Sequence, residues 1–403
     1  MEIIMTNWQE IESKYYMQIS PRTPLTLVRG KGARVWDDSG KEYLDFVAGW
    51  AVNSLGHCHP AVVEAVTKQV DTLIQTSNQF YTTPQLQLAQ LLVTHSCLDR
   101  VYVCNSGAEA NEGAVKLARR YGSLHLNGAY EVITAMNSFH GRTLMMTAAT
   151  GQEKFQHPYL PLPIGFKNVA YNDIKAIKAA TTEQTCAVML ELIEAEGGVN
   201  ITDDGYFKAV RNWCDEKGIL LILDEVQTGI GRLGTLFGYE QYGIEPDIMT
   251  LAKGLGSGVP IGAFMAKQKF CVFAPGEHGS TFGGNPLTSA AAYATVKFVI
   301  DNDISGNAKR IGQYLTKALI ILKDKYPFVT EVRGRGLLLA MEFSADIGAD
   351  VLNACLEKGL LVNRVKPNAL RFIPPLIISE REVDEAIDIL DQALFSVSQK
   401  VVK

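Results

Sequence analysis

The sequence predicts an α/β protein with a large domain, built on a mostly parallel central sheet flanked by helices, and a smaller α+β domain. Three observations predict it. The 403-residue chain is longer than one hydrophobic core usually organises. Through its middle, short aliphatic runs alternate with segments of helical period, and beyond about residue 290 this alternation stops. We therefore expect an N-terminal segment over residues 1–55, a large domain over 56–290 and a small domain over 291–403.

Charge and cysteine content limit the classes of partner and the compartment. The 38 Lys and Arg residues are outnumbered by 43 Asp and Glu residues, and no basic run is present. We therefore expect neither nucleic acid nor an anionic membrane as a partner. The seven cysteines contain no CxxC pair, which indicates reduced thiols. Residues 1–12 lack the basic and apolar regions of a signal peptide, so we expect a cytoplasmic protein.

The first hundred residues predict short elements followed by helices. In order, we expect antiparallel strands over residues 33–37 and 42–46, helices over 60–74 and 84–93, and a strand over 101–104. Pro60 suits the first position of a helix. The segment His57-Cys58-His59 has no further ligands at metal-binding spacing, and we expect no metal site there.

The strand over 101–104 opens into Asn105-Ser106-Gly107-Ala108, after which a helical pattern begins. A strand, a hydroxyl with a glycine, and a helix N-terminus together capture phosphate, because free backbone N–H groups and the positive end of the helix dipole face the anion. Ser106 is alternatively a plain N-cap. The strand, turn and helix in succession favour the phosphate site.

A further strand over 131–136 ends at Ser138-Phe139-His140-Gly141-Arg142. The Phe139 ring is suited to stack on a planar heterocycle, and Arg142 is suited to hold a carboxylate. The sequence leaves a structural alternative open, in which Phe139 is a core residue and His140 a buried, hydrogen-bonded imidazole.

The most informative strand covers residues 219–223, five consecutive aliphatic side chains that are typical of a strand buried on both faces of a parallel sheet. It delivers Asp224 to the carboxyl end of the sheet, where open α/β sheets bind ligands. A second apolar run, 247–252, delivers Lys253. Burial of its amine lowers the pKa of Lys253, as Schiff-base chemistry requires. Pyridoxal phosphate uses both groups, a lysine for its aldehyde and a carboxylate for its ring nitrogen. Alternatively, Asp224 caps a turn and Lys253 lies on the surface.

Two glycine-rich segments invite a ligand-binding interpretation. Residues 229–234 match the dinucleotide pattern GxGxxG, but five residues separate them from the strand end and a turn-rich sequence follows, so we reject that interpretation. Residues 279–286 form a tight loop of hydroxyl and glycine residues before a helix over 287–300. This loop suits either an anion or a plain turn.

The C-terminal part predicts a helix over 314–322, strands over 329–332, 336–343 and 360–363, and a final helix with an apolar face over 383–394. Ser379 and Glu382 form a capping box before that last helix. Arg371, which precedes a pair of prolines, is either a surface charge or a clamp for a carboxylate.

Taken together, these motifs resemble the class III pyridoxal-phosphate aminotransferases of fold type I, and most closely the acetylornithine aminotransferase family. The resemblance covers essentially the whole chain. The segments that carry it are residues 25–30, 51–60, 105–111, 138–143, 223–234, 250–258 and 280–286. Seven motifs in the same order are far more specific than any one of them.

The resemblance implies that both termini contribute to the small domain and that pyridoxal 5′-phosphate is the cofactor. Lys253 is expected to hold it as a Schiff base, and Asp224 to pair with its ring nitrogen. Thr281 is expected to reach the phosphate of the partner subunit, which makes a homodimer part of the site. The other cofactor contacts that the resemblance implies are Ser106, Gly107, Ala108, Phe139, His140, Val226 and Gln227.

The same resemblance implies transfer of the δ-amino group of N2-acetylornithine to 2-oxoglutarate, in arginine biosynthesis. Arg142 and Ser280 are expected to contact the substrate, and Glu196 and Arg371 to form a switchable pair. Where the family usually reads Glu-Pro-[Ile/Val]-Gln-Gly-Glu-Gly-Gly, this chain departs from the pattern, at Leu192, Glu194 and Ala195. These departures leave ornithine, succinylornithine, succinyldiaminopimelate, lysine-type and 4-aminobutyrate donors open. A catalytically silent cofactor-binding protein and a Schiff-base lyase are alternatives from other classes.

Overall fold

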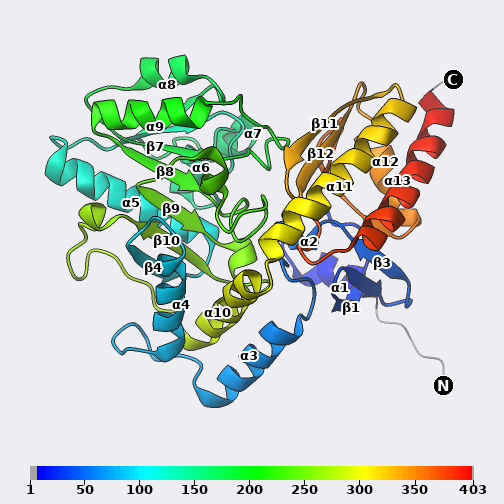
Figure 1. Cartoon of the computed structure of the whole chain (residues 1–403), viewed down its shortest axis with the longest axis horizontal. Helices are drawn as coiled ribbons and strands as arrows, with labels where there is room; N and C mark the ends of the chain where they lie inside the picture. Colours follow the sequence, from blue (N-terminus) through cyan, green and yellow to red (C-terminus); the bar gives the residue numbers. More distant parts are fainter. Residues whose placement is uncertain (1–6, 402–403) are drawn as a thin grey trace.

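The computed structural model describes residues 7–401 and has a larger and a smaller lobe (Figure 1). The larger lobe is built on a seven-stranded sheet in the order β4-β10-β9-β8-β7-β5-β6. Its strands are β4 (Arg100–Cys104), β5 (Glu131–Ala135), β6 (Phe166–Val169), β7 (Thr185–Glu191), β8 (Leu220–Asp224), β9 (Ile248–Leu251) and β10 (Gly262–Ala266). Strand β10 is antiparallel to both of its neighbours, β4 and β9, and the pairs from β9 to β6 are all parallel, so the predicted mostly parallel α/β sheet is confirmed.

Every residue of β7, β8 and β9 is buried, because helices cover both faces of the sheet (Figure 1). The covering helices are α5 (Gly107–His125), α6 (Leu144–Ala149), α8 (Ile174–Ala180) and α9 (Tyr206–Lys217). Strand β8 pairs in parallel with β9, with Asp224 opposite Thr250. The two strands therefore end side by side, and they bring Asp224 and Lys253 to the same edge of the sheet.

The smaller lobe contains an antiparallel sheet in the order β11-β12-β15-β14. Its strands are β11 (Val329–Arg335), β12 (Leu338–Phe343), β14 (Asn363–Lys366) and β15 (Ala369–Phe372), accompanied by α11 (Ile304–Lys325), α12 (Gly348–Glu357) and α13 (Glu380–Val401). The predicted capping box opens α13, since the Ser379 hydroxyl accepts from the Glu382 N–H and the Glu382 carboxylate accepts from the Ser379 N–H.

The N-terminal elements join the smaller lobe through a second sheet, ordered β1-β2-β3-β13. Its strands are β1 (Leu27–Lys31), β2 (Arg34–Asp37), β3 (Glu42–Asp45) and β13 (Leu360–Leu361), and α1 (Trp8–Tyr15) precedes them. Strands β2 and β3 are the predicted antiparallel pair, and β3 pairs in parallel with β13. Residues 1–6 of the predicted N-terminal segment lie outside the described residues, and the boundaries near residues 55 and 290 stay a prediction.

The remaining helices are either short or lie at the base of the larger lobe in Figure 1. They are α2 (Ala48–Ala51), α3 (Pro60–Thr72), α4 (Thr83–Thr94), α7 (Glu153–Gln156) and α10 (Pro286–Asp301), with four short 3₁₀ turns at His157–Tyr159, Gly238–Tyr242, Lys253–Leu255 and Gln268–Phe270. Helix α3 begins at Pro60 as predicted, and the His59 ring accepts from the Ala61 N–H. No helix in the described range combines the length and apolar character needed to cross a bilayer.

Helix α3 differs from an ordinary amphipathic helix in what its apolar face meets. Of the apolar side chains that predicted the helix, only Val62 is buried in this chain. Val66 is half-buried and packs beside Val62 against the core. Val63 and Val70, with Leu73 and Ile74 just after the helix, form an exposed α3 stripe, of which Val70 is 49% exposed. Helical spacing therefore predicted the element correctly, but the stripe does not belong to this chain's own core.

The glycine-rich segment 229–234 forms turns, and the element that follows is the 3₁₀ turn at Gly238–Tyr242 rather than an α-helix. Its arginine, Arg232, is fully buried and donates to the carbonyl oxygens of Leu337 and Pro374. This segment therefore joins the two lobes, which agrees with the rejection of a dinucleotide site.

Candidate active site

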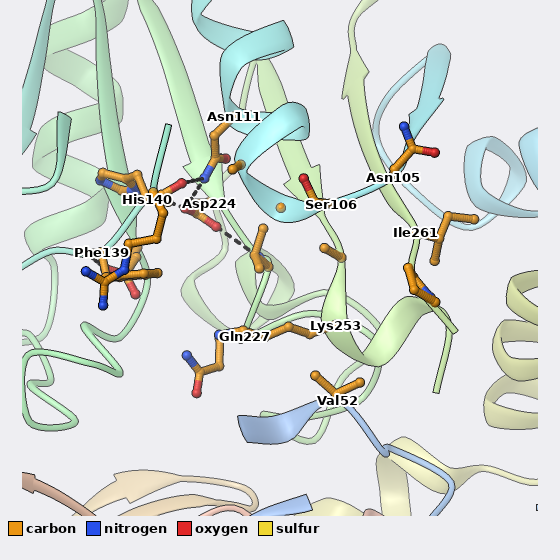
Figure 2. Close-up of a pocket in the computed structure, with 18 of the residues that line it drawn as sticks. Val52, Asn105, Ser106, Asn111, Phe139, His140, Asp224, Gln227, Lys253 and Ile261 are labelled. Carbon is orange, nitrogen blue, oxygen red and sulfur yellow. Dashed lines mark hydrogen bonds and ion pairs between the residues drawn. The ribbon is translucent and has the colours of Figure 1, made fainter. Parts of the chain in front are cut away.

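A cavity of about 440 Å³ lies where the carboxyl ends of β8 and β9 meet the first turn of α5 (Figure 2). This volume is in the range of ordinary small-molecule sites. The cavity is lined by Val52, Asn105–Ala108, Asn111, Phe139–Arg142, Glu191, Asp224, Val226, Gln227, Ala252, Lys253 and Gly258–Ile261. Ten of the fourteen residues predicted for the site are brought together here.

Asp224 is 3% exposed, and three N–H donors fix the orientation of its carboxylate. The Asn111 amide and the His140 Nδ1 lie 2.7 and 2.8 Å from Oδ2, and the Val226 N–H donates to Oδ1 at 3.0 Å (Figure 2). A carboxylate has about four acceptor positions. One position on Oδ1 therefore remains for a donor in the cavity, so Asp224 does more than cap a turn.

Lys253 lies two residues beyond the end of β9 and reaches the cavity from its other side (Figure 2). Burial lowers the pKa of its amine below the ordinary value, against the opposing charge of Glu196. Its backbone has a φ of +45°, a left-handed conformation that is strained for a residue with a side chain. The surface-lysine alternative is excluded, because Lys253 is held against the sheet edge with its amine away from bulk solvent.

The first turn of α5 forms the end of the cavity next to Ser106 (Figure 2). The Ser106 Oγ accepts from the Glu109 N–H, so Ser106 is the N-cap. The N–H groups of Gly107 and Ala108, in the first turn, have no intrahelical acceptor. A Cβ on Gly107 would lie 2.9 Å from Val226, so only glycine lets α5 approach that wall. The N-cap and anion-site interpretations are therefore compatible.

Phe139 and His140 form a third wall of the cavity. His140 is fully buried, which lowers its pKa, but the hydrogen bond to Asp224 together with the negative charges of Asp224 and Glu191 outweighs burial and raises the pKa. The Phe139 N–H donates to the Glu191 carboxylate at 2.8 Å. Burial raises the pKa of Glu191 to about 8. His140 is thus a buried, hydrogen-bonded imidazole, as the structural alternative expected. Phe139 instead faces the cavity, as stacking on a planar heterocycle requires.

Arg142 lies at the exposed mouth of the cavity. Its guanidinium stacks on the Phe155 ring at 4.0 Å and lies 5.3 Å from the Phe139 ring. No carboxylate within residues 7–401 forms an ion pair with it. A cation held by aromatic rings in this way remains available to a negatively charged group of a substrate.

Glu196 and Arg371 form an ion pair beside the cavity, in which Arg371 is buried and Glu196 is partly exposed. Arg371 is 0% exposed, and its Nη1 donates to Glu196 at 2.7 Å, so the surface-charge alternative is wrong. Gln227 joins the pair, because its Oε1 accepts from Arg371 and its Nε2 donates to Glu196. Burial raises the pKa of Glu196, but Arg371 and Lys253 outweigh it and hold the pKa at about 2.

Ser280 and Thr281 do not line the cavity of their own chain. Thr281 is exposed, and the Ser280 Oγ accepts from Asn105 and from the Gly283 N–H. Gln75 and Asn78 donate to the carbonyl oxygens of Thr281 and Ser280 and hold the loop at the surface. The site roles of both residues stay predictions.

Sequence reasoning assigned no role to Asn111, Glu191 and Asn363. Asn111 orients Asp224, which lies 113 positions away, Glu191 holds Phe139, 52 positions away, and Asn363 accepts from Arg371. The first two partners are set by the order of strands in the sheet, and no local pattern signals them. Asn363 ends the predicted strand over 360–363, but its pairing with β15 depends on the register of the sheet, which the sequence did not predict.

The comparisons with known proteins agree with this geometry. A family model for class III aminotransferases matches residues 15–394. An acetylornithine aminotransferase from Caldanaerobacter subterraneus subsp. tengcongensis is 52% identical, over 96% of this chain and 98% of that protein. An acetylornithine aminotransferase from Methanocaldococcus jannaschii is 50% identical, over 98% of this chain and 99% of that protein. A crystal structure of the ornithine aminotransferase from Toxoplasma gondii, with partial occupancy of PLP at its active site, is 35% identical with a TM-score of 0.95, over 98% of this chain and 95% of that one.

The matched range includes every residue that lines the cavity, from Val52 to Ile261, and also the strand β15 that carries Arg371. Identity of about half over almost the full length of both proteins places the fold and the site in one family. This chain therefore belongs to the class III aminotransferases.

Proposed function

We propose that the protein transfers the δ-amino group of N2-acetylornithine to 2-oxoglutarate, with pyridoxal 5′-phosphate as cofactor. The products are N-acetylglutamate 5-semialdehyde and glutamate, the arginine-biosynthetic reaction. The observation that carries the proposal is the pairing of an amine, Lys253, with an oriented acid, Asp224, across one cavity. The names of the 52% and 50% identical relatives support the choice of donor.

The residues present fit pyridoxal phosphate at its ring nitrogen, its phosphate and its aldehyde. The free acceptor position on Asp224 suits a protonated ring nitrogen, and the first-turn N–H groups of Gly107 and Ala108 suit a phosphate. Lys253 supplies the amine for the aldehyde, while Val226 and Phe139 provide apolar walls. When bound, this cofactor supplies an electron sink for the carbon that loses a proton.

The protein's own groups then carry out positioning and proton transfer. The amine of Lys253, with its lowered pKa, would take a proton from the nitrogen-bearing carbon of the donor and deliver it to the carbon that bore the cofactor's aldehyde. Asp224, fixed by Asn111 and His140, keeps a negative charge beside the ring nitrogen. The same groups serve both half-reactions, so donor and acceptor bind in turn.

The Glu196–Arg371 pair explains how one site accepts two different substrates. A donor that presents its distal amine leaves its carboxylate far from the reacting carbon, near Arg142. Arg371 is then without a substrate partner, and Glu196 neutralises it at 2.7 Å. 2-Oxoglutarate carries two carboxylates, so Glu196 must move aside for the second one to reach Arg371, a suitable fork for it.

Initial rates with a panel of amino donors test the proposed function. With 2-oxoglutarate as acceptor, we expect N-acetylornithine to give a higher kcat/KM than ornithine, succinylornithine, succinyldiaminopimelate or 4-aminobutyrate. The 35% identical ornithine aminotransferase makes ornithine the second candidate. A faster rate with ornithine would overturn the donor assignment, and no turnover with any donor would favour a silent binding protein.

The variant Glu196→Gln tests the switch. Removing the charge leaves Arg371 unneutralised while the donor is bound, so we expect kcat/KM for N-acetylornithine to fall roughly tenfold, as when a charged hydrogen bond is lost. The kcat/KM for 2-oxoglutarate is expected to stay the same or rise. Glu245→Gln, which removes a surface partner of Lys267, is the matched control and should change neither constant. Equal losses in both half-reactions would contradict the switch.

We also propose a cytoplasmic homodimer in which Thr281 completes the partner's site. The exposed α3 stripe leads into Gln75 and Asn78, which hold the Thr281 loop at the surface. An apolar stripe of this kind favours burial against a second copy. Light scattering is expected to give about twice the 44.2 kDa chain mass, and a monomer with full activity would contradict the shared site. The seven unpaired cysteines support a reducing compartment.

A further inference from the structure

Arg371 uses the two sides of its guanidinium for different partners. Its Nε and Nη2 donate to the Oδ1 of Asn363 at 3.1 and 2.8 Å, whereas Nη1 donates to Glu196 and Gln227. The edge formed by Nε and Nη2 is therefore occupied by a residue of the protein. Once Glu196 moves away, the end formed by Nη1 and Nη2 is the part of the fork that can receive a carboxylate.

The sheet of the smaller lobe fixes this arrangement. Asn363 on β14 lies directly opposite Arg371 on the adjacent antiparallel strand β15. Side chains of directly opposed residues on such strands are neighbours on one face of the sheet. The amide oxygen therefore reaches Arg371 without a mobile loop, and the orientation of the guanidinium is set by strand register.

The chemistry of the acceptor at residue 363 matters because Arg371 is 0% exposed. A buried guanidinium with unpaired N–H groups is costly, so the Nε edge needs an acceptor. An amide oxygen satisfies two of these donors and carries no net charge. A carboxylate in the same place would satisfy them equally well and would also neutralise Arg371 permanently.

We propose that Asn363 is a positioning residue for the acceptor half-reaction, which blocks the Nε edge of Arg371 and keeps its charge free for the dicarboxylate substrate. This inference rests on the role proposed above for Arg371 in binding 2-oxoglutarate. It explains how Glu196 can act as a switch, because Glu196 is then the only anion of the described residues paired with Arg371. The donor, which does not use Arg371, is indifferent to residue 363.

The isosteric variant Asn363→Asp separates this role from a structural one. It keeps the shape and both hydrogen bonds, so we expect an unchanged melting temperature and kcat/KM for N-acetylornithine within about twofold of the wild type. The KM for 2-oxoglutarate is expected to rise at least about tenfold, because a charged pair forms a stronger hydrogen bond than a neutral acceptor and competes with the substrate. Arg364→Gln changes the net charge equally at the next, exposed residue of β14 and should have no effect.

Binding of glutarate to the cofactor-loaded enzyme provides a measurement that does not depend on turnover. Glutarate has the two carboxylates of the acceptor without its keto group, and its Kd is expected to rise at least about tenfold in Asn363→Asp, about 1.4 kcal/mol. Unchanged constants for both 2-oxoglutarate and glutarate would overturn the inference. Equal losses in both half-reactions with a lower melting temperature would also overturn it, since they indicate a structural role alone. If the wild type itself fails to use 2-oxoglutarate, the proposed function fails instead.

Discussion

Replacing Lys253 with alanine is expected to abolish amino transfer and to leave the fold intact. The substitution removes the only amine that lines the cavity on the described part of the chain, and with it the base of lowered pKa. Loss of a positioned general base alone costs about 10²–10⁴ in rate, and loss of the covalent attachment point adds to this. We expect kcat to fall at least about 10⁴-fold, together with the visible absorbance of a lysine Schiff base.

Stability separates this effect from misfolding. Burial disfavours the charged amine of Lys253 and opposes its attraction to Glu196, so alanine removes little net stabilisation and should leave the melting temperature nearly unchanged. Lys267→Ala is the matched control, because Lys267 pairs with Glu245 at the surface and is expected to leave kcat unaffected. Substantial turnover by Lys253→Ala would refute the assignment of the catalytic amine.

The second large effect is expected for Asp224→Asn. Asparagine has the same shape, but it cannot accept from Asn111, His140 and Val226 and also hold a negative charge at the ring nitrogen. Removing a preorganised electrostatic group from an active site costs about 10²–10³ in kcat. We expect a loss of at least that size in both half-reactions, measured by stopped-flow absorbance.

His140 gives a second measurement of the same variant. The hydrogen bond to Asp224 raises the pKa of His140 against its burial, so in Asp224→Asn that pKa should fall below its wild-type value. The stability that the pair contributes is present at low pH and is lost as pH rises through the folded pKa of His140. The variant should therefore lose this pH dependence, as measured by thermal unfolding across pH.

Asp247→Asn is the matched control for the loss of a buried aspartate. Asp247 accepts from Arg211 and from the Leu221 N–H, and it lies just before β9, away from the cavity. Its replacement should lower the melting temperature while turnover per folded molecule is kept. If Asp247→Asn and Asp224→Asn lose activity to the same extent, Asp224 has no special role.

Local sequence patterns determined the elements of the site and its chemistry. The aliphatic run before Asp224 required a strand buried on both faces, and the serine and glycine after the β4 run required a helix start. These properties depend on hydrogen bonding and burial within a few residues, so they can be read along the chain. The rejection of the dinucleotide pattern and the prediction of the capping box at Ser379 likewise depended only on residues close together in the sequence.

Tertiary structure alone decided which of these elements meet and which face each one buries. The sequence left Arg371 as a surface charge or a clamp, and the interior position of β15 buries it against Glu196 and Asn363. Spacing predicted α3 as a helix, but the packing of the chain leaves its apolar stripe exposed. The physical reason is that burial and ion pairing depend on contacts between residues far apart in sequence, and strand order and register set those contacts.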